Sequence, residues 1–211
     1  AFSGGIDSLA LISFMPEDER NRSAAVYVDH SIRKREELDE EIKLNRKNAR
    51  KLGVPLYIIR LGEGEVERYA LEKDCGIGAA ARSRRYSGLE RFREEKGYNW
   101  ILTAHHLNDQ TETLIMRMMS SSPFWSYGGI REIEGRIRRP LLSLDKSQIK
   151  KKVRESGLKW SEDSTNNDEN YRRNWIRKNI LPSITKKQKL LISSIASNVA
   201  SLPSRSVDVT Y

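Results

Sequence analysis

Cysteine and long apolar runs are scarce in this sequence of 211 residues. The one cysteine, Cys75, can form neither an intrachain disulfide nor a paired-cysteine redox or zinc motif. This scarcity favours a reducing, cytoplasmic location. The sequence has no run of about 18 apolar residues, so we expect no membrane-spanning helix and no membrane partner. A strand is expected before the glycines at positions 4 and 5, and the residues Ala1 and Phe2 are too few to form it. We therefore expect that an N-terminal segment is missing.

The composition is that of a soluble globular protein, with 37% hydrophobic and 32% charged residues. The chain is long enough for one sizeable core and an appendage. Its formal net charge is +9, and residues 131–189 hold 17 of the 38 Lys and Arg residues but only 8 of the 29 acidic ones. A basic surplus confined to one region is typical of a surface that binds a polyanion. The alternative is an ordinary solvated face.

Short apolar segments alternate with helical ones along the first 120 residues. The sequence predicts strands at 24–28, 54–61 and 99–104, and helices at 8–15, 35–53, 78–97 and 109–119. The segment VPLYIIRL at 54–61 is apolar almost throughout, so we expect a strand buried on both faces. The alternation predicts an α/β fold, a twisted parallel sheet with helices on both faces.

The pattern changes after residue 120. SSSPFWSYGGI at 120–130 is expected to be a loop, with Trp125 and Tyr127 as aromatics that could stack a base or pack against their own neighbours. A helix is predicted after Asp145, and a weakly amphipathic one at 188–202. We therefore expect a small helical C-terminal extension.

The loop FSGGIDS at 2–8 is the first candidate binding site. Gly4 and Gly5 allow positive φ angles, so that successive N–H groups can turn inward as an anion nest. The dipole of a helix beginning near Asp7 and the hydroxyls of Ser3 and Ser8 would add to it. The sequence is neither GxGxxG nor a Walker loop. An aspartate suits such a site if it binds a magnesium ion that bridges phosphates; the alternative is a tight turn with a capping serine.

The loop sequence SGGIDS is similar to the PP-loop of the N-type ATP pyrophosphatases. Further blocks occur in the order seen in the tRNA(Ile)-lysidine synthetase family, and the resemblance covers roughly residues 2–182. These blocks are VDHSIR (28–33), GAAARSRRY (78–86), TAHHLNDQTET (103–113), RRPLL (138–142) and DSTNNDENYRRNWIR (163–177).

The resemblance implies an ATP-dependent ligase. Enzymes of this family adenylate the wobble cytidine of an isoleucine tRNA with a CAU anticodon, and then couple free lysine to C2 of that base, which gives lysidine, AMP and pyrophosphate. ATP, Mg²⁺, the tRNA and lysine are thus the implied ligands. By the same resemblance, 1–184 is the PP-loop catalytic domain, with 131–184 as its basic, tRNA-facing part, and 185–211 is a helical tail that could begin a C-terminal tRNA-binding region.

The site residues implied by the resemblance fall into four groups. The ATP contacts are Ser3, Gly4, Gly5, Ile6, Asp7, Ser8, Asp29, Arg82 and Arg85. The catalytic residues are Asp7, His105, Asp109 and Glu112, and the magnesium ligands are Asp7 and Asp109. The tRNA or substrate residues are Asn166, Arg173, Asn174 and Arg177.

The block HHLNDQTE can be interpreted from its residues as well. A helix beginning near Asn108 would follow His105 directly and place Asp109 and Glu112 on one face. Two carboxylates there could hold magnesium or a cationic amine, and one of them or the histidine could accept a proton from lysine. The alternative is a capped, solvated helix start. The family usually has Asp where this chain has Asn108.

Two basic segments have similar alternatives. Arg82 and Arg85 lie three apart on a predicted helix and could reach one anion together, whereas a solvated face is the alternative. The polar residues of 163–177 would be loop and cap residues on structure alone. In the segment 120–130 the family commonly has a glycine-rich stretch where this chain has SSSPF.

Two other functions compete with the ligase. A PP-loop tRNA thiolase would activate the same kind of oxygen but generally needs paired cysteines or a cluster, and the chain has only Cys75. A non-catalytic nucleotide-binding or RNA-binding relic is disfavoured because the loop residues and both acidic residues of the HHLNDQTE block are present. The sequence is compatible with a homodimer as well as with a monomer.

Overall fold

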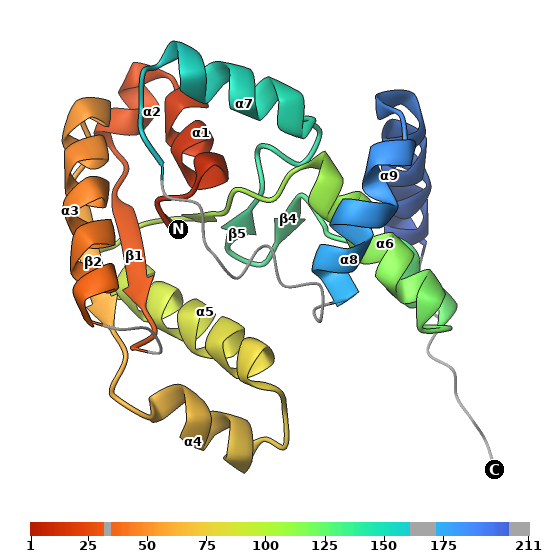
Figure 1. Cartoon of the computed structure of the whole chain (residues 1–211), viewed down its shortest axis with the longest axis horizontal. Helices are drawn as coiled ribbons and strands as arrows, with labels where there is room; N and C mark the ends of the chain where they lie inside the picture. The colour runs from red at the N-terminus through yellow and green to blue at the C-terminus, as the bar shows by residue number, and fades with distance from the viewer. Residues whose placement is uncertain (32–34, 161–171, 203–211) are drawn as a thin grey trace. The chain divides into compact units, whose positions relative to one another are not determined.

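The computed structural model describes residues 1–31, 35–160 and 172–202 (Figure 1). The chain divides into two compact units. Of the described residues, unit 1 contains 1–104, 135–138 and 147–160, and unit 2 contains 105–134, 139–146 and 172–202. This division follows packing and does not test the predicted domain boundary at residue 184, which stays a prediction. No helix within the described ranges is long and apolar enough to cross a membrane.

Unit 1 is built on short parallel strands. β1 (Ala25–Asp29) pairs in parallel with β2 (Leu56–Arg60), and β3 (Ile101–Leu102) pairs in parallel with β5 (Ile137–Arg138). The first two residues lie between these pairs, because the N–H of Phe2 donates to the carbonyl of Val26 at 2.8 Å and the Ala1 nitrogen donates to the carbonyl of Leu102 at 2.6 Å. The parallel α/β architecture predicted from the sequence is confirmed.

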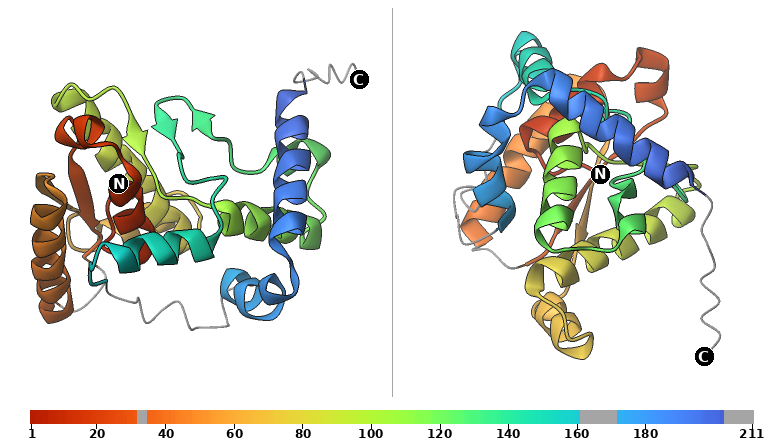
Figure 2. Two further views of the ribbon diagram at one scale, coloured as in Figure 1. Left: turned by 90° about the horizontal axis from the view of Figure 1, so that it is seen from above. Right: turned by 90° about the vertical axis from the view of Figure 1, so that its right-hand side faces the viewer.

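Helices cover both faces of β1 and β2 (Figures 1 and 2). Side chains alternate along a strand, so Val26 and Val28 point to one face, where α5 packs with Leu89, and Tyr27 points to the other. The helices of unit 1 are α1 (Ile6–Phe14), α2 (Glu17–Asn21), α3 (Arg35–Leu52), α4 (Glu65–Glu72), α5 (Ile77–Glu95) and, from Ser147 onward, α7 (Lys146–Glu155).

The expectation that 54–61 forms a strand buried on both faces is wrong. None of the five residues of β2 is fully buried, and Tyr57 is 38% exposed. The cause is position in the sheet, because β2 pairs with β1 on one side and no described strand pairs with its other side. Tyr57 instead covers Phe92 of α5, with ring centroids 4.9 Å apart.

Unit 2 is mainly helical. α6 (Leu107–Met119) packs against α8 (Arg172–Asn179) and α9 (Lys186–Ser201). The remaining elements are the 3₁₀ helices η1 (Phe124–Gly128) and η3 (Leu181–Ser183) and the short strand β4 (Ile133–Glu134). The predicted tail helix is α9, which begins two residues earlier than expected because Thr185 and Gln188 form a capping box. The predicted loop at 120–130 contains η1.

Candidate functional site

The glycine loop of unit 1 lies between the segment paired with β1 and the first turn of α1. Gly4 has φ of +77°, as predicted, whereas Gly5 is extended with φ of −71° and serves as the N-cap of α1. The helix begins at Ile6, so its free N–H groups and positive dipole end lie directly after the glycines. Asp7 lies in the first helical turn. Backbone donors and a helix terminus at this position suit an anion.

Ser8 braces this loop from inside. Its side chain is buried, and its Oγ donates to the carbonyl of Gly5 at 2.9 Å. The same oxygen accepts from the N–H of Ser3 and lies 3.3 Å from the Ser3 hydroxyl. The hydroxyl of Ser8 therefore holds the two ends of the loop together, while Ser3 is exposed.

Asn45 of α3 lies against the loop, and the sequence reasoning missed it. A Cβ atom built on Gly4 would lie 2.0 Å from Oδ1 of Asn45, so the asparagine side chain occupies the space that any other residue at position 4 would need. Asn45 belongs to the buried side of α3 together with Leu38, Ile42 and Ala49. An asparagine in an apolar helical stripe is the signal that could have identified it.

Asp29, predicted to contact ATP, ends β1 and is buried. Its Oδ1 accepts from the N–H of Ser31 at 2.8 Å, and its Oδ2 lies 4.0 Å from Nη1 of Arg35 and 3.9 Å from Nε of Arg60. Two guanidinium groups thus compensate a buried carboxylate at the carboxyl end of the strand.

The three arginines in the first half of α5 have different neighbours. Arg84 donates from Nε to Glu65 at 2.7 Å, whereas Arg82 and Arg85 lie near the Tyr86 ring, with their guanidinium carbons 4.9 Å and 5.8 Å from its centroid. Burial lowers the pKa of Arg85. Arg82 and Arg85, the predicted pair, thus share one aromatic neighbour.

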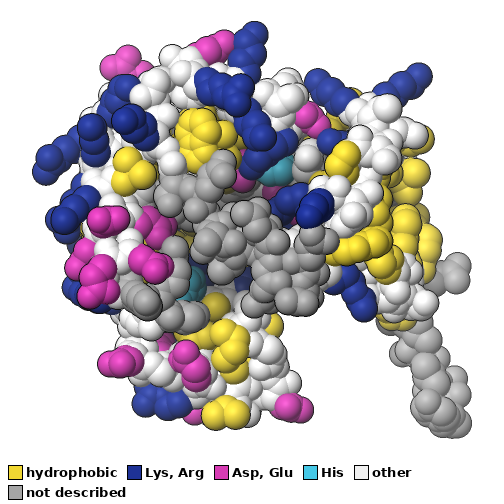
Figure 3. All heavy atoms as spheres, viewed as in Figure 1, with side chains coloured by type: hydrophobic (Ala, Val, Ile, Leu, Met, Phe, Trp, Pro, Cys, Tyr) yellow, Lys and Arg dark blue, Asp and Glu magenta, His cyan; other side chains and the backbone are white. Residues whose placement is uncertain are grey.

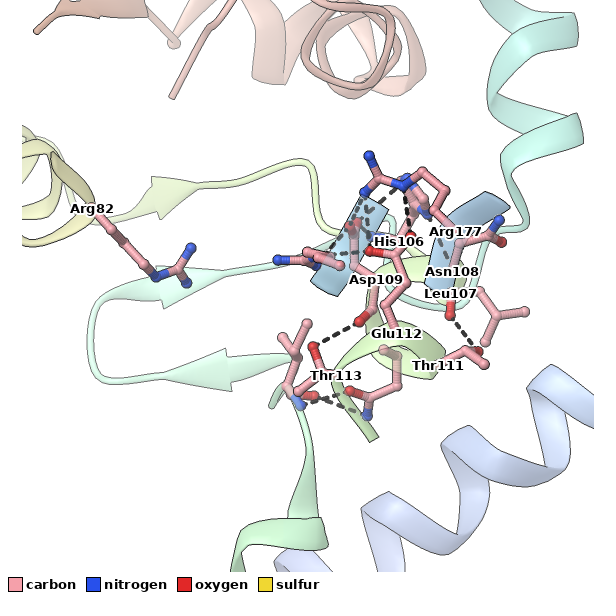
Figure 4. A network of polar contacts seen from close by, with 12 residues as sticks. Arg82, His106, Leu107, Asn108, Asp109, Thr111, Glu112, Thr113 and Arg177 are labelled. Atoms are coloured by element: carbon pink, nitrogen blue, oxygen red, sulfur yellow. Dashed lines mark hydrogen bonds and ion pairs between the residues drawn. The ribbon is translucent and has the colours of Figure 1, made fainter. Parts of the chain in front are cut away.

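The two predicted catalytic acids of unit 2, Asp109 and Glu112, lie in the first half of α6 (Figure 4). The N-cap is His106, one residue later than the histidine predicted from the sequence, and its Nδ1 accepts from the N–H of Asn108 at 3.2 Å. Asp109 completes a capping box, because its Oδ2 accepts from the N–H of His106 at 2.9 Å. Glu112 follows one turn later and its side chain is 1% exposed. His105 is half-buried just before the cap.

Two arginines of α8 bind these carboxylates. Arg173 donates from Nε to Oε2 of Glu112 at 2.7 Å and from Nη2 to Oδ1 of Asp109 at 3.1 Å. Arg177, one turn further, donates to both oxygens of Glu112 at 2.9 and 3.0 Å. We call Asp109, Glu112, Arg173 and Arg177 the acid–arginine cluster. The structure thus brings two predicted catalytic acids together with two predicted substrate residues.

The other predicted substrate residues are less informative. Asn174 is half-buried on α8, and Asn166 lies outside the described residues. In the described part of the chain, no group of three or more His, Cys, Asp and Glu side chains is placed to hold a metal ion. The predicted magnesium roles of Asp7 and Asp109 stay predictions.

Lys189 and Gln110 are buried polar residues of unit 2 that the sequence reasoning missed. The Nζ of Lys189 donates to Oδ2 of Asp145 at 3.1 Å and to Oδ1 of Asn108 at 3.2 Å, which ties α9 to the start of α6. Gln110 accepts from the N–H of Ile130 at 2.6 Å and donates to the carbonyl of the same residue at 3.2 Å. These bonds position α6 and hence the acid–arginine cluster.

A basic surface lies on unit 1, where exposed lysines and arginines cover the C-terminal half of α3 and the neighbouring α7 (Figure 3). The two helices are joined near their C-terminal ends, because Asn48 donates to the carbonyl of Lys159 at 2.7 Å and Lys51 donates to that of Gly157 at 3.0 Å. The exposed members that define this basic surface are Arg46, Lys47, Arg50, Lys150, Lys151 and Arg154.

Comparison with known families identifies the loop-bearing part of the chain. The sequence profile of the PP-loop domain matches residues 1–184. Among curated relatives, the tRNA(Ile)-lysidine synthase of Treponema denticola is 33% identical over 190 residues, which are 88% of this chain and 41% of that protein. The enzyme of the same name from Thermus thermophilus is 35% identical over 187 residues, 89% of this chain and 35% of the relative. The chain therefore spans less than half the length of the curated relatives it matches.

Solved structures are similar in fold at low sequence identity. A U34-tRNA thiolase from Methanococcus maripaludis, solved with its [4Fe-4S] cluster, has a TM-score of 0.70 at 14% identity. The superposed region covers all of this chain and 74% of the thiolase chain. The NH₃-dependent NAD synthetase of Campylobacter jejuni has a TM-score of 0.54 at 14% identity, covering 96% of this chain and 86% of its own. These similarities establish the fold alone.

Proposed function

Because the chain belongs to the PP-loop domain family, we propose that it ligates free lysine to C2 of the wobble cytidine of an isoleucine tRNA with a CAU anticodon, using ATP. The observation that carries the proposal is the loop at residues 3–8, where a left-handed Gly4 precedes the N-terminus of α1, an arrangement suited to an anion. The choice of lysine and tRNA rests on the curated relatives, which are named tRNA(Ile)-lysidine synthases at 33–36% identity.

The reaction needs an activated cytidine oxygen, because that oxygen is otherwise a poor leaving group. The O2 atom bonds to the α-phosphorus of ATP while the bond from that phosphorus to the bridging oxygen breaks, and pyrophosphate leaves. The ε-amine of lysine then forms a bond to C2, the bond from C2 to O2 breaks, and AMP leaves with the oxygen. The glycine loop would hold the phosphates and stabilise the charge that develops on pyrophosphate.

Magnesium is the metal that this chemistry implies, and Asp7 fits it. Mg²⁺ at phosphates commonly takes one or two carboxylates, with phosphate and water oxygens completing the shell. Asp7 in the first turn of α1 supplies one carboxylate beside the anion loop. Asp109 is less available, because its two oxygens accept hydrogen bonds from Arg173 and from the N–H of His106. Magnesium would neutralise phosphate charge there.

Asp109 and Glu112 are acidic groups of unit 2 that bind cations. Arg173 and Arg177 neutralise them in this structure, so a lysine ammonium group would take the place of a guanidinium group on these carboxylates. Lysine carries an ammonium group at neutral pH and must lose a proton before it attacks. We therefore assign lysine binding to this pair, with one of the acids or His105 as the proton acceptor.

The basic surface supports contact with the tRNA backbone. Its lysines and arginines lie exposed on two adjoining helices and are suited to phosphates without reading sequence. It includes α3, which lies outside the basic region 131–189 predicted from the sequence. The target base itself must be accessible and unstacked, as it is in an anticodon loop. A cytoplasmic location and a homodimer stay predictions.

The decisive experiment is incorporation of labelled lysine into an isoleucine tRNA transcript with a CAU anticodon. The expected result is incorporation that requires ATP and is lost in Asp7→Asn. ATP–pyrophosphate exchange in the presence of tRNA tests the first step separately. Exchange without lysine incorporation would contradict lysine as the acceptor, and no exchange would contradict the whole proposal. The chain should be assayed beside a full-length relative as a positive control.

A further inference from the structure

Asn45 is buried directly behind the glycine loop without a hydrogen-bond partner. It is 1% exposed, and among the described residues neither its Oδ1 nor its Nδ2 has a partner. A Cβ atom on Gly4 would lie 2.0 Å from that Oδ1 and 2.8 Å from that Nδ2. The carboxamide of Asn45 therefore packs closely against Gly4, the one loop residue that has a left-handed backbone.

An unpaired buried amide is unfavourable, so packing does not explain the asparagine. Leaving a buried donor or acceptor unsatisfied is destabilising, and an apolar side chain of the same size would avoid this cost. The next buried asparagine on the same helix, Asn48, shows the usual solution, because its Nδ2 donates to the carbonyl of Lys159 at 2.7 Å. Asn45 is buried as well but lacks such a partner within the described chain.

Gln110 in unit 2 shows the paired form of the same arrangement. Its buried carboxamide also faces a left-handed glycine, Gly129 with φ of +65°, where a Cβ atom would lie 2.6 Å from Oε1. There the carboxamide accepts from the N–H of Ile130 and donates to its carbonyl. A carboxamide behind a glycine turn can thus fix the orientation of the adjoining peptide group.

The geometry of a peptide group connects Asn45 to anion binding. The N–H and C=O of one peptide unit point in opposite directions, so turning an N–H outward to an anion turns the carbonyl inward. An inward carbonyl in a buried position needs a donor. Oδ1 and Nδ2 of Asn45 lie 2.0 and 2.8 Å from the position of a Cβ atom on Gly4, so the carboxamide lies next to the residue that joins these peptide units, and a glycine without Cβ permits both the rotation and the close approach.

We propose that Asn45 is a positioning residue of the glycine loop, which hydrogen-bonds the peptide groups beside Gly4 when a pyrophosphate-type anion is bound. The proposal rests on the proposed function in so far as the anion belongs to ATP. Asn45 acts through the backbone and does not touch the ligand. Binding of the anion would orient these peptide groups so that one of them pairs with the Asn45 carboxamide.

The test compares two asparagines of α3 by titration with inorganic pyrophosphate and by thermal unfolding of the full chain. Asn45→Leu should weaken pyrophosphate binding about fivefold, equivalent to about 1 kcal/mol for one hydrogen bond. It should leave the unfolding midpoint unchanged or raise it, because an unpaired amide is removed. Asn48→Leu should do the reverse, lowering the midpoint and leaving the affinity unchanged. Asn45→Ala controls for the size of leucine: its smaller side chain cannot clash with the loop, and it should weaken pyrophosphate binding by a similar factor.

A third variant tests the donor itself. In Asn45→Asp a protonated carboxyl group can donate and a carboxylate cannot. The pyrophosphate affinity of Asn45→Asp should therefore approach that of the wild type as pH falls. If the ratio of the two affinities does not change with pH, the proposal is overturned. Wild-type affinity in both Asn45→Leu and Asn45→Ala would also overturn it. If the wild-type chain itself fails to bind pyrophosphate, the proposed function fails instead.

Discussion

Replacing Glu112 by glutamine tests the acid–arginine cluster most directly. The substitution keeps the shape of a side chain that is 1% exposed but removes its charge. Glu112 accepts three hydrogen bonds from Arg173 and Arg177, at 2.7, 2.9 and 3.0 Å. After the substitution, two guanidinium groups face a neutral amide, one end of which is itself a donor.

The expected loss of stability follows from the burial of the three partners. Removing one partner of a fully buried ion pair costs about 3–5 kcal/mol. Arg173 and Arg177 are 37% and 42% exposed, so they can regain part of their hydration, and the loss should be nearer to about 2 kcal/mol. For a chain of this size, that loss lowers the unfolding midpoint by about 4–8 °C.

The assay is thermal unfolding followed by circular dichroism, with Glu155→Gln as the control. Glu155 pairs with Lys151 at 3.9 Å, and both side chains are mostly exposed, so its loss should shift the midpoint by less than about 1 °C. Glu112→Gln should also abolish lysine incorporation while ATP binding remains. A midpoint for Glu112→Gln as close to wild type as that of the control would refute the reasoning that this carboxylate holds α8.

Three further changes test other parts of the chain. Gly4→Ala should weaken ATP binding at least about tenfold, because φ is +77° and the new Cβ would lie 2.0 Å from the buried Oδ1 of Asn45. The control is Gly53→Ala, where φ is +71° and no atom lies near the new Cβ. This variant should reduce stability by about 1 kcal/mol and leave ATP binding intact. The logarithm of the tRNA association constant should fall linearly with the logarithm of salt concentration, and Lys150→Gln should reduce the magnitude of that slope by about one. A tRNA affinity that does not change with salt would show that the basic surface is an ordinary solvated face. The N–H of Gly62 and the guanidinium group of Arg84 lower the pKa of Glu65 from 4.5. The ionised carboxylate therefore stabilises the folded chain above that value, and this contribution is lost as pH falls through the lowered pKa. Acid unfolding should therefore be shallower in Glu65→Gln, and unchanged steepness would contradict this assignment.

The local pattern predicted the elements of unit 1 well. The helix at 35–53 and the strand at 24–28 are α3 and β1, since periods of 3.6 and 2 residues depend on near neighbours only. Whether a strand is central or at an edge depends on which segments pair with it, and this is not encoded locally. β2 is apolar enough for a central strand, yet pairing on one side leaves it half-exposed.

The acid–arginine cluster was predicted in parts but not as a whole. Spacings of three and four residues place Asp109 with Glu112, and Arg173 with Arg177, on single helix faces. Nothing in the local pattern pairs these two faces, which are about sixty residues apart in the chain. Substrate contacts for the arginines and catalysis for the acids stay predictions, and the structure adds that the two pairs bind each other.

Asparagine and glutamine residues on the apolar side of a helix indicate tertiary contacts that hydrophobic periodicity does not predict. Asn45, Asn48 and Gln110 each lie on the buried side of a helix, where hydrophobicity alone would place an aliphatic residue. Asn48 and Gln110 bond to backbone groups of loops, because a carboxamide offers a donor and an acceptor to a peptide unit that has no strand partner. A polar residue in an apolar stripe therefore indicates that a non-regular backbone segment packs at that level of the helix. For Asn45 that segment is the glycine loop, so this polar residue in the apolar stripe of α3 indicates where the loop packs.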